Sequence, residues 1–497
     1  MYGAEKSDNV ILPKKQANNG LQWPAELVEG RALTKGSPHE PVTTWTQSQV
    51  FVSPGLMRVR QVAQEGKVGQ FTALLHHVTV EELEASYRAL KRKAAAGIDG
   101  QTWESYGENL QTNLIDLHAR MHNGSYRAKP ARRVYIDKAD GTKRPLSILC
   151  LEDKIAQHSV SQILHAIYEK KFVGFSYGFR PGRSQHQALD ALYTGLLYRK
   201  VNWVLDLDIQ GFFDAVDHDW MLRMLAHLVA DRRILRLIRA WMEVGVADDQ
   251  GRRVGSERGL PQGAVISPVL ANVFLHYVFD LWSRKWRKRQ ACGEMIIVRF
   301  ADDIIAGFQH QAEAECFLRE LTGRFDEFHL QPHPQKTRLI EFGRFAIRDR
   351  QKRGQRKPET FDFLGFTHIC RYNWKGKFIL TRHTKRSRMR SSLQAIKQGL
   401  RSRLHDPIGK TGTWLRRVVQ GHLNYFAVPG NAKTISSFVY HVRRLWIRSL
   451  RRRSQRSCMP FTRYGPIADR FIPKPRILHP FPVARFMALT QGRSPVR

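Results

Sequence analysis

The sequence predicts an α+β fold followed by an α-helical region. Between residues 130 and 350, short β-rich apolar runs are mixed with helical patterns, as in a sheet covered by helices. From Trp414 to Phe426 and from Ile435 to Leu450, apolar side chains recur with the spacing of an amphipathic helix. Basic residues fill the other positions of these two segments, so we expect helices packed as a bundle with a cationic outer face.

The other segments follow from composition and pattern. Residues 1–52 are polar and contain four prolines, which predicts a loosely ordered arm. Helical patterns fill 53–125, and Val80–Leu90 has the spacing of an amphipathic helix. Residues 348–358 are basic and predict a loop or insertion, and 456–497 form a short basic C-terminal segment.

The composition indicates a polyanionic partner. The chain has 497 residues, with 81 Lys and Arg against 44 Asp and Glu, which gives a formal net charge of +37. Nucleic acid is the simplest partner for such a chain. An anionic membrane is the weaker interpretation, because no run of 18 apolar residues occurs. We see no secretion signal, and five scattered cysteines without a CxxC pair favour neither a zinc ribbon nor a disulfide framework.

The positive charge is concentrated toward the C-terminus. Between Arg382 and Pro460 there are 19 Lys or Arg and one acid, Asp406, which is about half of the net charge. A solubilising surface is the alternative explanation, but such surfaces mix charges of both signs. We therefore expect a nucleic-acid-binding surface on the predicted bundle.

Two pairs of acids interrupt apolar strands. In Val201–Val216, Asp206 and Asp208 alternate with apolar residues, and residues two apart on a strand share a face. In Met295–Phe308, Asp302 and Asp303 lie between two apolar runs, which predicts a hairpin with adjacent carboxylates at its turn.

Clustered carboxylates in apolar strands need a compensating charge. They are hard oxygen ligands suited to Mg²⁺, and two such ions about 3.5–4 Å apart can stabilise both oxygens of an in-line phosphoryl displacement. The alternative is that the acids cap turns or pair with arginines. On a chain of this charge, the metal site is the favoured interpretation.

Several motifs, in order, resemble those of reverse transcriptases. Arg299–Asp303 (RFADD) resembles their aromatic-x-Asp-Asp motif, and Asp208 resembles their first metal-binding aspartate. Further matching motifs are Phe175–Ser184 (FSYGFRPGRS), Gly259–Gly263 (GLPQG) with Ser267–Pro268, His333–Thr337 (HPQKT), Phe363–Phe366 (FLGF) and the maturase-like segment Gly421–Asn431. The set is most similar to group II intron-encoded reverse transcriptase/maturases and covers about residues 55–485.

The resemblance implies a right-hand polymerase, with fingers and palm on an antiparallel sheet and an α-helical thumb. The implied domains are an N-terminal arm (1–52), an N-terminal extension and start of the fingers (53–130), fingers and palm (131–375), a thumb or maturase domain (376–455) and a C-terminal segment (456–497). Asp208, Asp302 and Asp303 would be the catalytic acids. Together with Ile209 they would be the positions that bind two Mg²⁺, with Mn²⁺ as a substitute.

The resemblance also implies residues that bind substrate. Phe213 would be the steric gate that prefers dNTPs to NTPs, or else a core residue. Lys138 and Arg144, on an expected fingers hairpin, would grip the triphosphate, or else be solvated. Gln262 would lie near template and dNTP, or else cap a helix.

Two further motifs leave both readings open. Arg180, with Arg183, would touch template or nucleotide, or else lie on a surface loop. Lys336 would protonate the pyrophosphate leaving group, or else pair with an acid. Gly365 would let the primer approach a tight turn closely.

Two departures from the family pattern affect the expected activity. Phe300 stands where the family usually has Tyr, so we expect activity with altered fidelity. Without a Cys/His-rich module, we expect no HNH-type endonuclease domain.

The expected function is that of an RNA-directed DNA polymerase which also binds intron RNA to assist splicing and mobility. The expected partners are group II intron RNA, RNA template and DNA primer, dNTPs and target DNA, with no membrane, in a cytoplasmic and bacterial setting, as monomer or dimer. A domesticated defence or repair reverse transcriptase, and a splicing factor without polymerase activity, remain alternatives.

Overall fold

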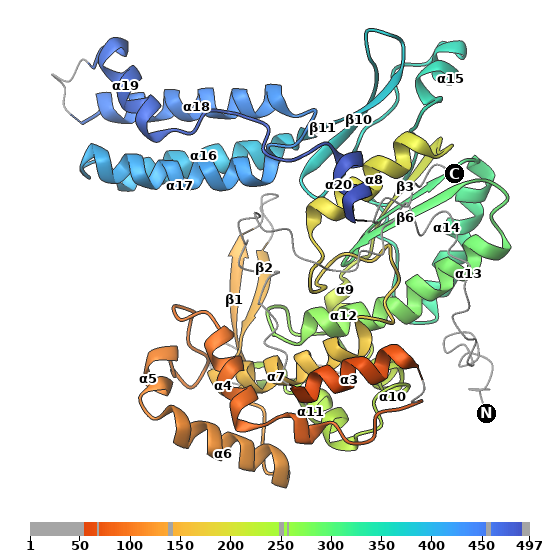
Figure 1. Cartoon of the computed structure of the whole chain (residues 1–497), viewed down its shortest axis with the longest axis vertical. Helices are drawn as coiled ribbons and strands as arrows, with labels where there is room; N and C mark the ends of the chain where they lie inside the picture. Colours follow the sequence, from red (N-terminus) through yellow and green to blue (C-terminus); the bar gives the residue numbers. More distant parts are fainter. Residues whose placement is uncertain are drawn as a thin grey trace.

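The computed structural model describes residues 54–66, 69–137, 143–247, 253–255, 258–453 and 459–489. The arm predicted over 1–52 lies outside these residues. Figure 1 shows a group of helices from the first part of the chain, a central sheet with its helices, and an elongated helical domain at the opposite end. The predicted α+β fold with a helical C-terminal region is confirmed.

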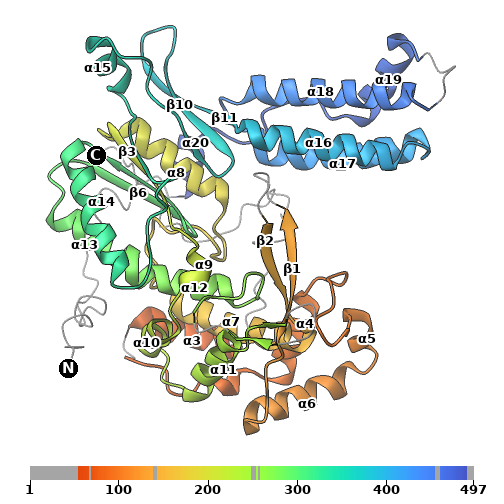
Figure 2. The same cartoon turned by 180° about the vertical axis from the view of Figure 1, so that it is seen from behind.

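The first part of the chain is helical and carries one projecting hairpin. Thr79 caps its amphipathic helix by accepting a hydrogen bond from Glu82 N, so the helix predicted at Val80–Leu90 is confirmed as α4. The antiparallel hairpin of β1 and β2 points toward the helical domain (Figures 1 and 2). The elements are α3 (Pro54–Glu65), η1 (Leu75–His77), α4 (Val80–Ala89), α5 (Trp103–Gly107), α6 (Leu110–Asn123), β1 (Ala131–Asp137), β2 (Lys143–Ile148) and α7 (Leu151–Tyr168).

The central sheet has the order β6-β7-β3-β8, and all its pairs are antiparallel. Its strands are β3 (Trp203–Asp208), β6 (Met295–Phe300), β7 (Asp303–Phe308) and β8 (Arg338–Glu341). The helices of this part are α8 (Gln185–Tyr198), α9 (Phe212–Ala215), α10 (His218–Ala226), α11 (Arg232–Glu243), α12 (Ser267–Leu275), the π-helical turn η2 (His276–Asp280), α13 (Leu281–Arg289), α14 (Gln311–Asp326) and α15 (Ala346–Lys352). The short strands β4 (Val246–Ala247) and β5 (Arg253–Val254) extend the β2-β1 sheet. Because α15 occupies 346–352, the loop predicted at 348–358 is only partly a loop.

Alternation along the strands separates two cores. In β3, Leu205 and Leu207 pack into the core shared with the N-terminal helices, whereas Val204 packs into the core shared with the helical domain. Asp206 and Asp208 therefore lie on the side of the helical domain. The sheet thus presents its acids toward the basic part of the chain.

The helical domain follows a second sheet, of order β11-β10-β9, with β9 (Phe361–Phe363), β10 (Phe366–Tyr372) and β11 (Phe378–Thr384). Its helices are α16 (Arg386–Ser402), α17 (Ile408–Phe426), α18 (Ala432–Arg451), α19 (Phe461–Phe471) and α20 (Pro482–Leu489). The two helices predicted from the apolar spacing are confirmed as α17 and α18. Leu415, Val419 and Leu423 are buried on one stripe of α17.

The end of the described chain returns to the central part, where α20 packs on α8 (Figure 1). Asp190 of α8 is buried, and its carboxylate accepts hydrogen bonds from Arg382 of β11 and Arg485 of α20. The same carboxylate therefore ties the helical domain and the returning segment to the central part. Within the described ranges, none of the helices has the length and apolar character that crossing a bilayer requires.

Candidate active site

Four carboxylates gather at the end of the central sheet. In the pairing of β3 with β7, Asp208 lies directly opposite Asp303, and directly opposed residues share a face of the sheet. Asp302 lies on the turn that joins β6 to β7, and Asp206 lies two residues before Asp208. The hairpin predicted with adjacent carboxylates at its turn is confirmed.

Burial and mutual repulsion perturb these acids. Burial, followed by the charges of Asp206, Asp302 and Asp208, raises the pKa of Asp303 well above its ordinary value. Burial also raises the pKa of Asp206 to about 6, although Arg338 acts in the opposite direction. Such crowding of like charges stores electrostatic free energy that a bound cation would release.

Basic side chains from neighbouring segments balance part of the negative charge of Asp206 and Asp208. The Nζ of Lys336 lies 2.9 Å from Asp208 Oδ2, and an Nη of Arg338 lies 3.4 Å from Asp206 Oδ2. Among the described residues, no three His, Cys, Asp or Glu side chains converge closely enough to hold a metal ion as they stand. The oxygen donors nevertheless match the preference of Mg²⁺, and burial together with the neighbouring carboxylates raises the pKa of Asp206 and Asp303, so the ionised forms lack a compensating charge there. The side chain of Ile209 is a hydrocarbon without a ligand atom, so that residue has only its backbone carbonyl to offer an ion.

A buried arginine holds the acidic turn. The guanidinium of Arg299 donates to both carboxylate oxygens of Asp280, at 2.7 and 2.6 Å, and also to Asn272 Oδ1 at 3.1 Å and Ala301 O at 3.0 Å. Arg299 and Asp280 are fully buried. Ala301 has a φ of +58°, which is unfavourable for a residue with a side chain, so the turn needs support of this kind.

The segment Phe175–Phe179 adds an extended edge to this turn. Arg299 N donates to Phe175 O at 2.9 Å, and Tyr177 N donates to Arg299 O at 2.8 Å. A Cβ on Gly178 would lie 2.3 Å from Ala301 N, so only glycine allows this approach. The FSYGF motif therefore packs against the carboxylate turn.

Phe213 and Gln262 lie close to each other. Phe213, on α9, is half-buried, and its backbone oxygen accepts a hydrogen bond from Leu260 N. The side-chain amide of Gln262 lies 3.4 Å from the carboxylate of Asp214, the next residue in α9. Because Ser147 N donates to Gln262 O at 2.7 Å, this loop also connects the base of the β1–β2 hairpin to the site.

The other residues predicted to bind substrate are Arg180, Lys138 and Arg144. Arg180 is buried, and its guanidinium donates to Glu169, Val173 O and Ser176 O, so the expectation that it touches template or nucleotide is wrong for this conformation. Lys138 lies outside the described residues. The backbone of Arg144 lies on β2 opposite Ile136.

Gly365 has a conformational role. Leu364 and Gly365 form the tight turn between β9 and β10, with φ values of +47° and +80°. Tyr425 Oη, from α17, donates to Leu364 O at 2.8 Å. The helical domain is therefore anchored directly on this turn.

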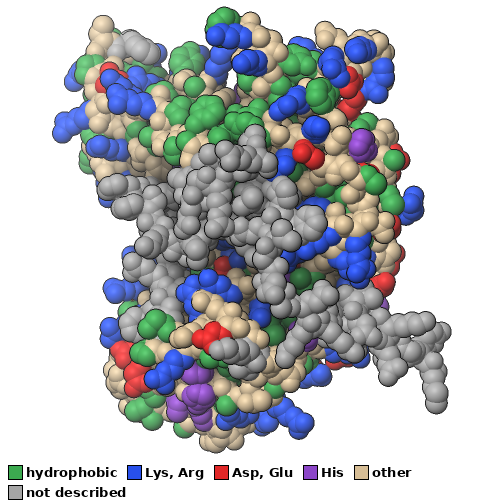
Figure 3. All heavy atoms as spheres, turned by 45° about the vertical axis from the view of Figure 1, so that its right-hand side comes forward, with side chains coloured by type: hydrophobic (Ala, Val, Ile, Leu, Met, Phe, Trp, Pro, Cys, Tyr) green, Lys and Arg blue, Asp and Glu red, His purple; other side chains and the backbone are tan. Residues whose placement is uncertain are grey.

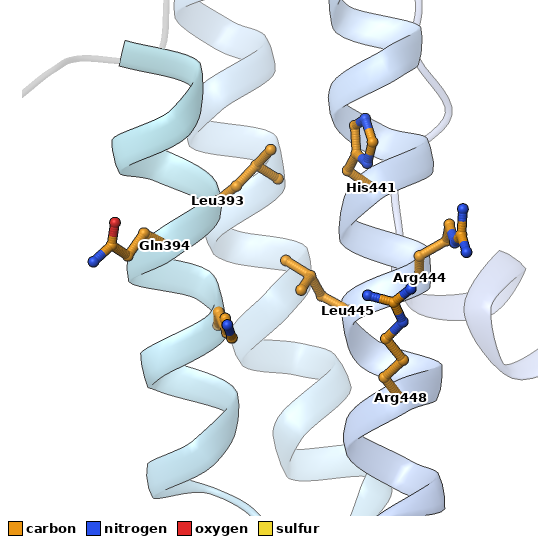
Figure 4. A pocket seen from close by; sticks show the side chains of 7 residues that line it. Leu393, Gln394, His441, Arg444, Leu445 and Arg448 are labelled. Atoms are coloured by element: carbon orange, nitrogen blue, oxygen red, sulfur yellow. The ribbon is translucent and has the colours of Figure 1, made fainter. Parts of the chain in front are cut away.

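The helical domain carries a basic groove between α16 and α18 (Figure 4). Leu393 and Leu445 lie in it, and Lys397, Arg444 and Arg448 supply cationic groups from both sides. On the face drawn in Figure 3, Lys and Arg side chains are spread over the upper part of the molecule, among few acidic ones. Phosphate groups are the natural ligands of such surfaces.

Sequence reasoning missed the Arg299–Asp280–Asn272 network. Asn272 lies in α12 and Asp280 lies at the end of η2, in a run of mostly apolar buried residues. A buried charge within an apolar helix was the available signal, because such a charge requires a buried partner.

Comparisons with known proteins show which sequences this chain resembles. Residues 136–368 match the family described as reverse transcriptase (RNA-dependent DNA polymerase). The group II intron-encoded protein LtrA of Lactococcus lactis subsp. cremoris is 32% identical over 227 residues, which are 44% of this chain and 37% of that protein. Protein YkfC of Escherichia coli is 35% identical over 210 residues, which are 41% of this chain and 55% of that protein.

A third relative is the uncharacterized 91 kDa protein in the cob intron of Schizosaccharomyces pombe. It is 40% identical over 170 residues, which are 34% of this chain and 21% of that protein. The chain thus matches about half or less of the length of each of these curated relatives.

Proposed function

We propose that this chain, which carries a reverse transcriptase domain at residues 136–368 and is similar to group II intron-encoded proteins, is an RNA-directed DNA polymerase that also assists intron splicing and mobility. The observation that carries this proposal is the register that sets Asp208 opposite Asp303, with Asp302 on the adjoining turn. A basic helical domain lies on the same side of the sheet. The implied reaction is attack of a primer 3′-hydroxyl on the α-phosphorus of a dNTP.

The carboxylates fit two divalent cations. Asp208 and Asp302 would hold both ions, the backbone of Ile209 would add an oxygen, and Asp303 would be the adjacent acid. Mg²⁺ is the expected cofactor and Mn²⁺ a substitute. When bound, these ions favour ionisation of the 3′-hydroxyl and neutralise the leaving pyrophosphate.

The remaining roles belong to the chain itself. The ring of Phe213 would fill the space that a ribose 2′-hydroxyl needs, so that dNTPs are preferred. Gln262 would position template and nucleotide from the loop before α12, which is hydrogen-bonded to α9 and to the β1–β2 hairpin. Lys138 and Arg144 would bind the triphosphate, since guanidinium and ammonium groups match phosphate oxygens.

Lys336 would donate a proton or a hydrogen bond to the leaving phosphate. Its side chain is largely exposed and reaches the site only through the contact with Asp208, so it can turn toward a substrate without breaking a buried contact.

The helical domain would act as a thumb that grips RNA. Its groove between α16 and α18 offers cations from both walls, and phosphate contacts make such binding weaken steeply with salt. The intron RNA would be clamped through its shape rather than its sequence. Target DNA and a cytoplasmic location belong to the same proposal.

The test separates chemistry from binding. Asp302→Ala and Asp303→Ala variants should lose cDNA synthesis on poly(rA)/oligo(dT) and keep their affinity for RNA. Retained nucleotide incorporation would refute the assignment of the metal-binding acids. An intron role predicts that the DNA flanking the coding sequence folds as a group II ribozyme, whereas a domesticated defence or repair enzyme has no such flanks.

A further inference from the structure

The hairpin of β10 and β11 projects from the body of the protein beside α15, far from the β1–β2 hairpin (Figures 1 and 2). Its tip, Asn373–Lys377, follows the last pair of the register, Tyr372 with Phe378. Trp374 at this tip is 88% exposed. A single exposed apolar side chain is ordinary on a protein surface, so exposure alone assigns nothing.

The tip is built as an ordered turn. Gly376 N donates to Asn373 O at 3.0 Å, and Asn373 N donates to Lys377 O at 2.9 Å. Asn373 Oδ1 accepts from Lys375 N and Lys377 N, at 2.9 and 2.8 Å, and Gly376 has a φ of +69°. Because the backbone is fixed by these bonds, the indole of Trp374 is presented on a rigid support, which lowers the entropy cost of binding.

The surroundings of the indole are cationic. Lys375 Nζ lies 4.5 Å from the ring centroid of Trp374, and Arg371 and Lys377 are exposed nearby in sequence. No Asp or Glu occurs between Asp362 and Asp406. An aromatic plane among cations, without acids, matches a ligand that combines a flat ring with negative charge. Unpaired nucleotides have both, because the base stacks on the ring and the phosphate contacts the cations.

We propose that this tip is a stacking site for an unpaired base of a bound RNA, outside the polymerase site. Six residue steps of β10 separate Tyr372 from Phe366, beside the Leu364–Gly365 turn, which is about 20 Å of extended chain. The site therefore contacts an RNA loop or bulge away from the primer end. The hairpin carries cations and no acid of its own, which favours a polyanionic partner, and stacking requires a base that is not paired in a duplex. The inference rests on the proposed RNA binding and not on the polymerase chemistry.

The test compares two fluorescently labelled RNAs by anisotropy, one a hairpin with an unpaired loop and one a blunt duplex of equal length. Trp374→Ala should weaken binding of the looped RNA roughly 5- to 150-fold, the range for one stacked base. It should leave duplex binding within about twofold, because a duplex offers no unpaired base. Trp374→Phe should retain most of the affinity, since it keeps an aromatic face. Ile115→Ala, at a 56% exposed apolar residue of α6, is the matched control.

A second measurement tests the cations. Replacing Lys375 and Lys377 together by Gln should reduce the slope of log affinity against log salt by about 1.4 for the looped RNA, if each contacts one phosphate of a single strand.

Three outcomes would overturn the inference. They are unchanged binding of looped RNA by Trp374→Ala, an equal loss on both RNAs, or an altered sedimentation coefficient of the protein alone without a change in RNA binding, which would identify an interface between copies of this chain. If the unmodified protein binds neither RNA, the proposed function fails instead.

Discussion

Replacing Arg299 or Asp280 should destabilise the protein and, separately, impair nucleotide addition. Both side chains are fully buried, and two of the guanidinium hydrogen bonds go to the Asp280 carboxylate at 2.7 and 2.6 Å. Removing one partner leaves an uncompensated buried charge, which costs about 3–5 kcal/mol of unfolding free energy. We therefore expect Arg299→Met and Asp280→Leu each to lower the free energy of unfolding by about that amount, measured by urea titration.

The double variant distinguishes stability from positioning. With both charges replaced by apolar groups of similar size, the double variant should recover most of the unfolding free energy lost in either single variant, because no charge remains buried without its partner. The turn still loses the donor that lies 3.0 Å from Ala301 O. A hydrogen bond from a charged donor contributes about 1.5–3 kcal/mol, which corresponds to roughly 10- to 150-fold in kcat for dTMP addition.

The assay is primer extension on poly(rA)/oligo(dT), with kcat and KM for dTTP measured on the double variant. We expect kcat to fall and KM to change little, because Arg299 is fully buried and holds the turn that carries Asp302. A double variant that regains both stability and full kcat would refute the positioning role and leave the pair a purely structural one.

Two further predictions concern the carboxylates and their turn, and a third concerns the nucleotide. Burial raises the pKa of Asp206 from 3.8 to about 6, so the contribution of this carboxyl to the free energy of unfolding without divalent ions should fall by up to about 3 kcal/mol as pH rises from about 4 to about 6. The difference between the unmodified protein and Asp206→Asn in urea titrations should follow this profile, and a difference that does not change with pH would contradict it. Gly178→Ala should displace the turn at Ala301 and abolish most primer extension while RNA binding persists. The control is Gly323→Ala, whose Cβ meets nothing within 4 Å, and equal activity of the two variants would count against the close approach. Phe213→Ala should raise incorporation of NTPs relative to dNTPs by roughly 10- to 200-fold in competition assays, and unchanged selectivity would show that the ring is only part of the core.

The acids and the helices were predictable because their signals are local. Asp206 and Asp208 share a face through the two-residue period of a strand, and this requires no knowledge of the partner strand. The apolar stripe of α17 predicts its buried side in the same way. The pairing of Asp208 with Asp303 could not be predicted from local sequence, because the register depends on a strand nearly 100 residues away.

Arg180 shows where motif reading fails. The motif places an arginine on a loop, but the direction of its side chain depends on which acceptors the loop offers. Here Glu169 and the carbonyls of Val173 and Ser176 lie on the inner side and satisfy the guanidinium. The sequence does not show which backbone carbonyls face the interior. It therefore cannot predict whether an arginine on this loop is buried or exposed.

Two basic side chains contact the acids of β3, and one of these contacts is held more firmly than the other. Arg338 lies on β8 directly opposite Asp206, whose side chain is 16% exposed, so this pair is set by the sheet register. Lys336 precedes β8, and its side chain is 62% exposed where it meets Asp208, so it is held by little besides that ion pair, a kind that contributes about 0–1 kcal/mol. An entering cation therefore competes with Lys336 at small cost, and it leaves the Asp206–Arg338 pair in place. Of the two carboxylates of β3, Asp208 is thus the more exposed one and the one with the more exposed partner, so it is the one that we expect to meet a ligand first.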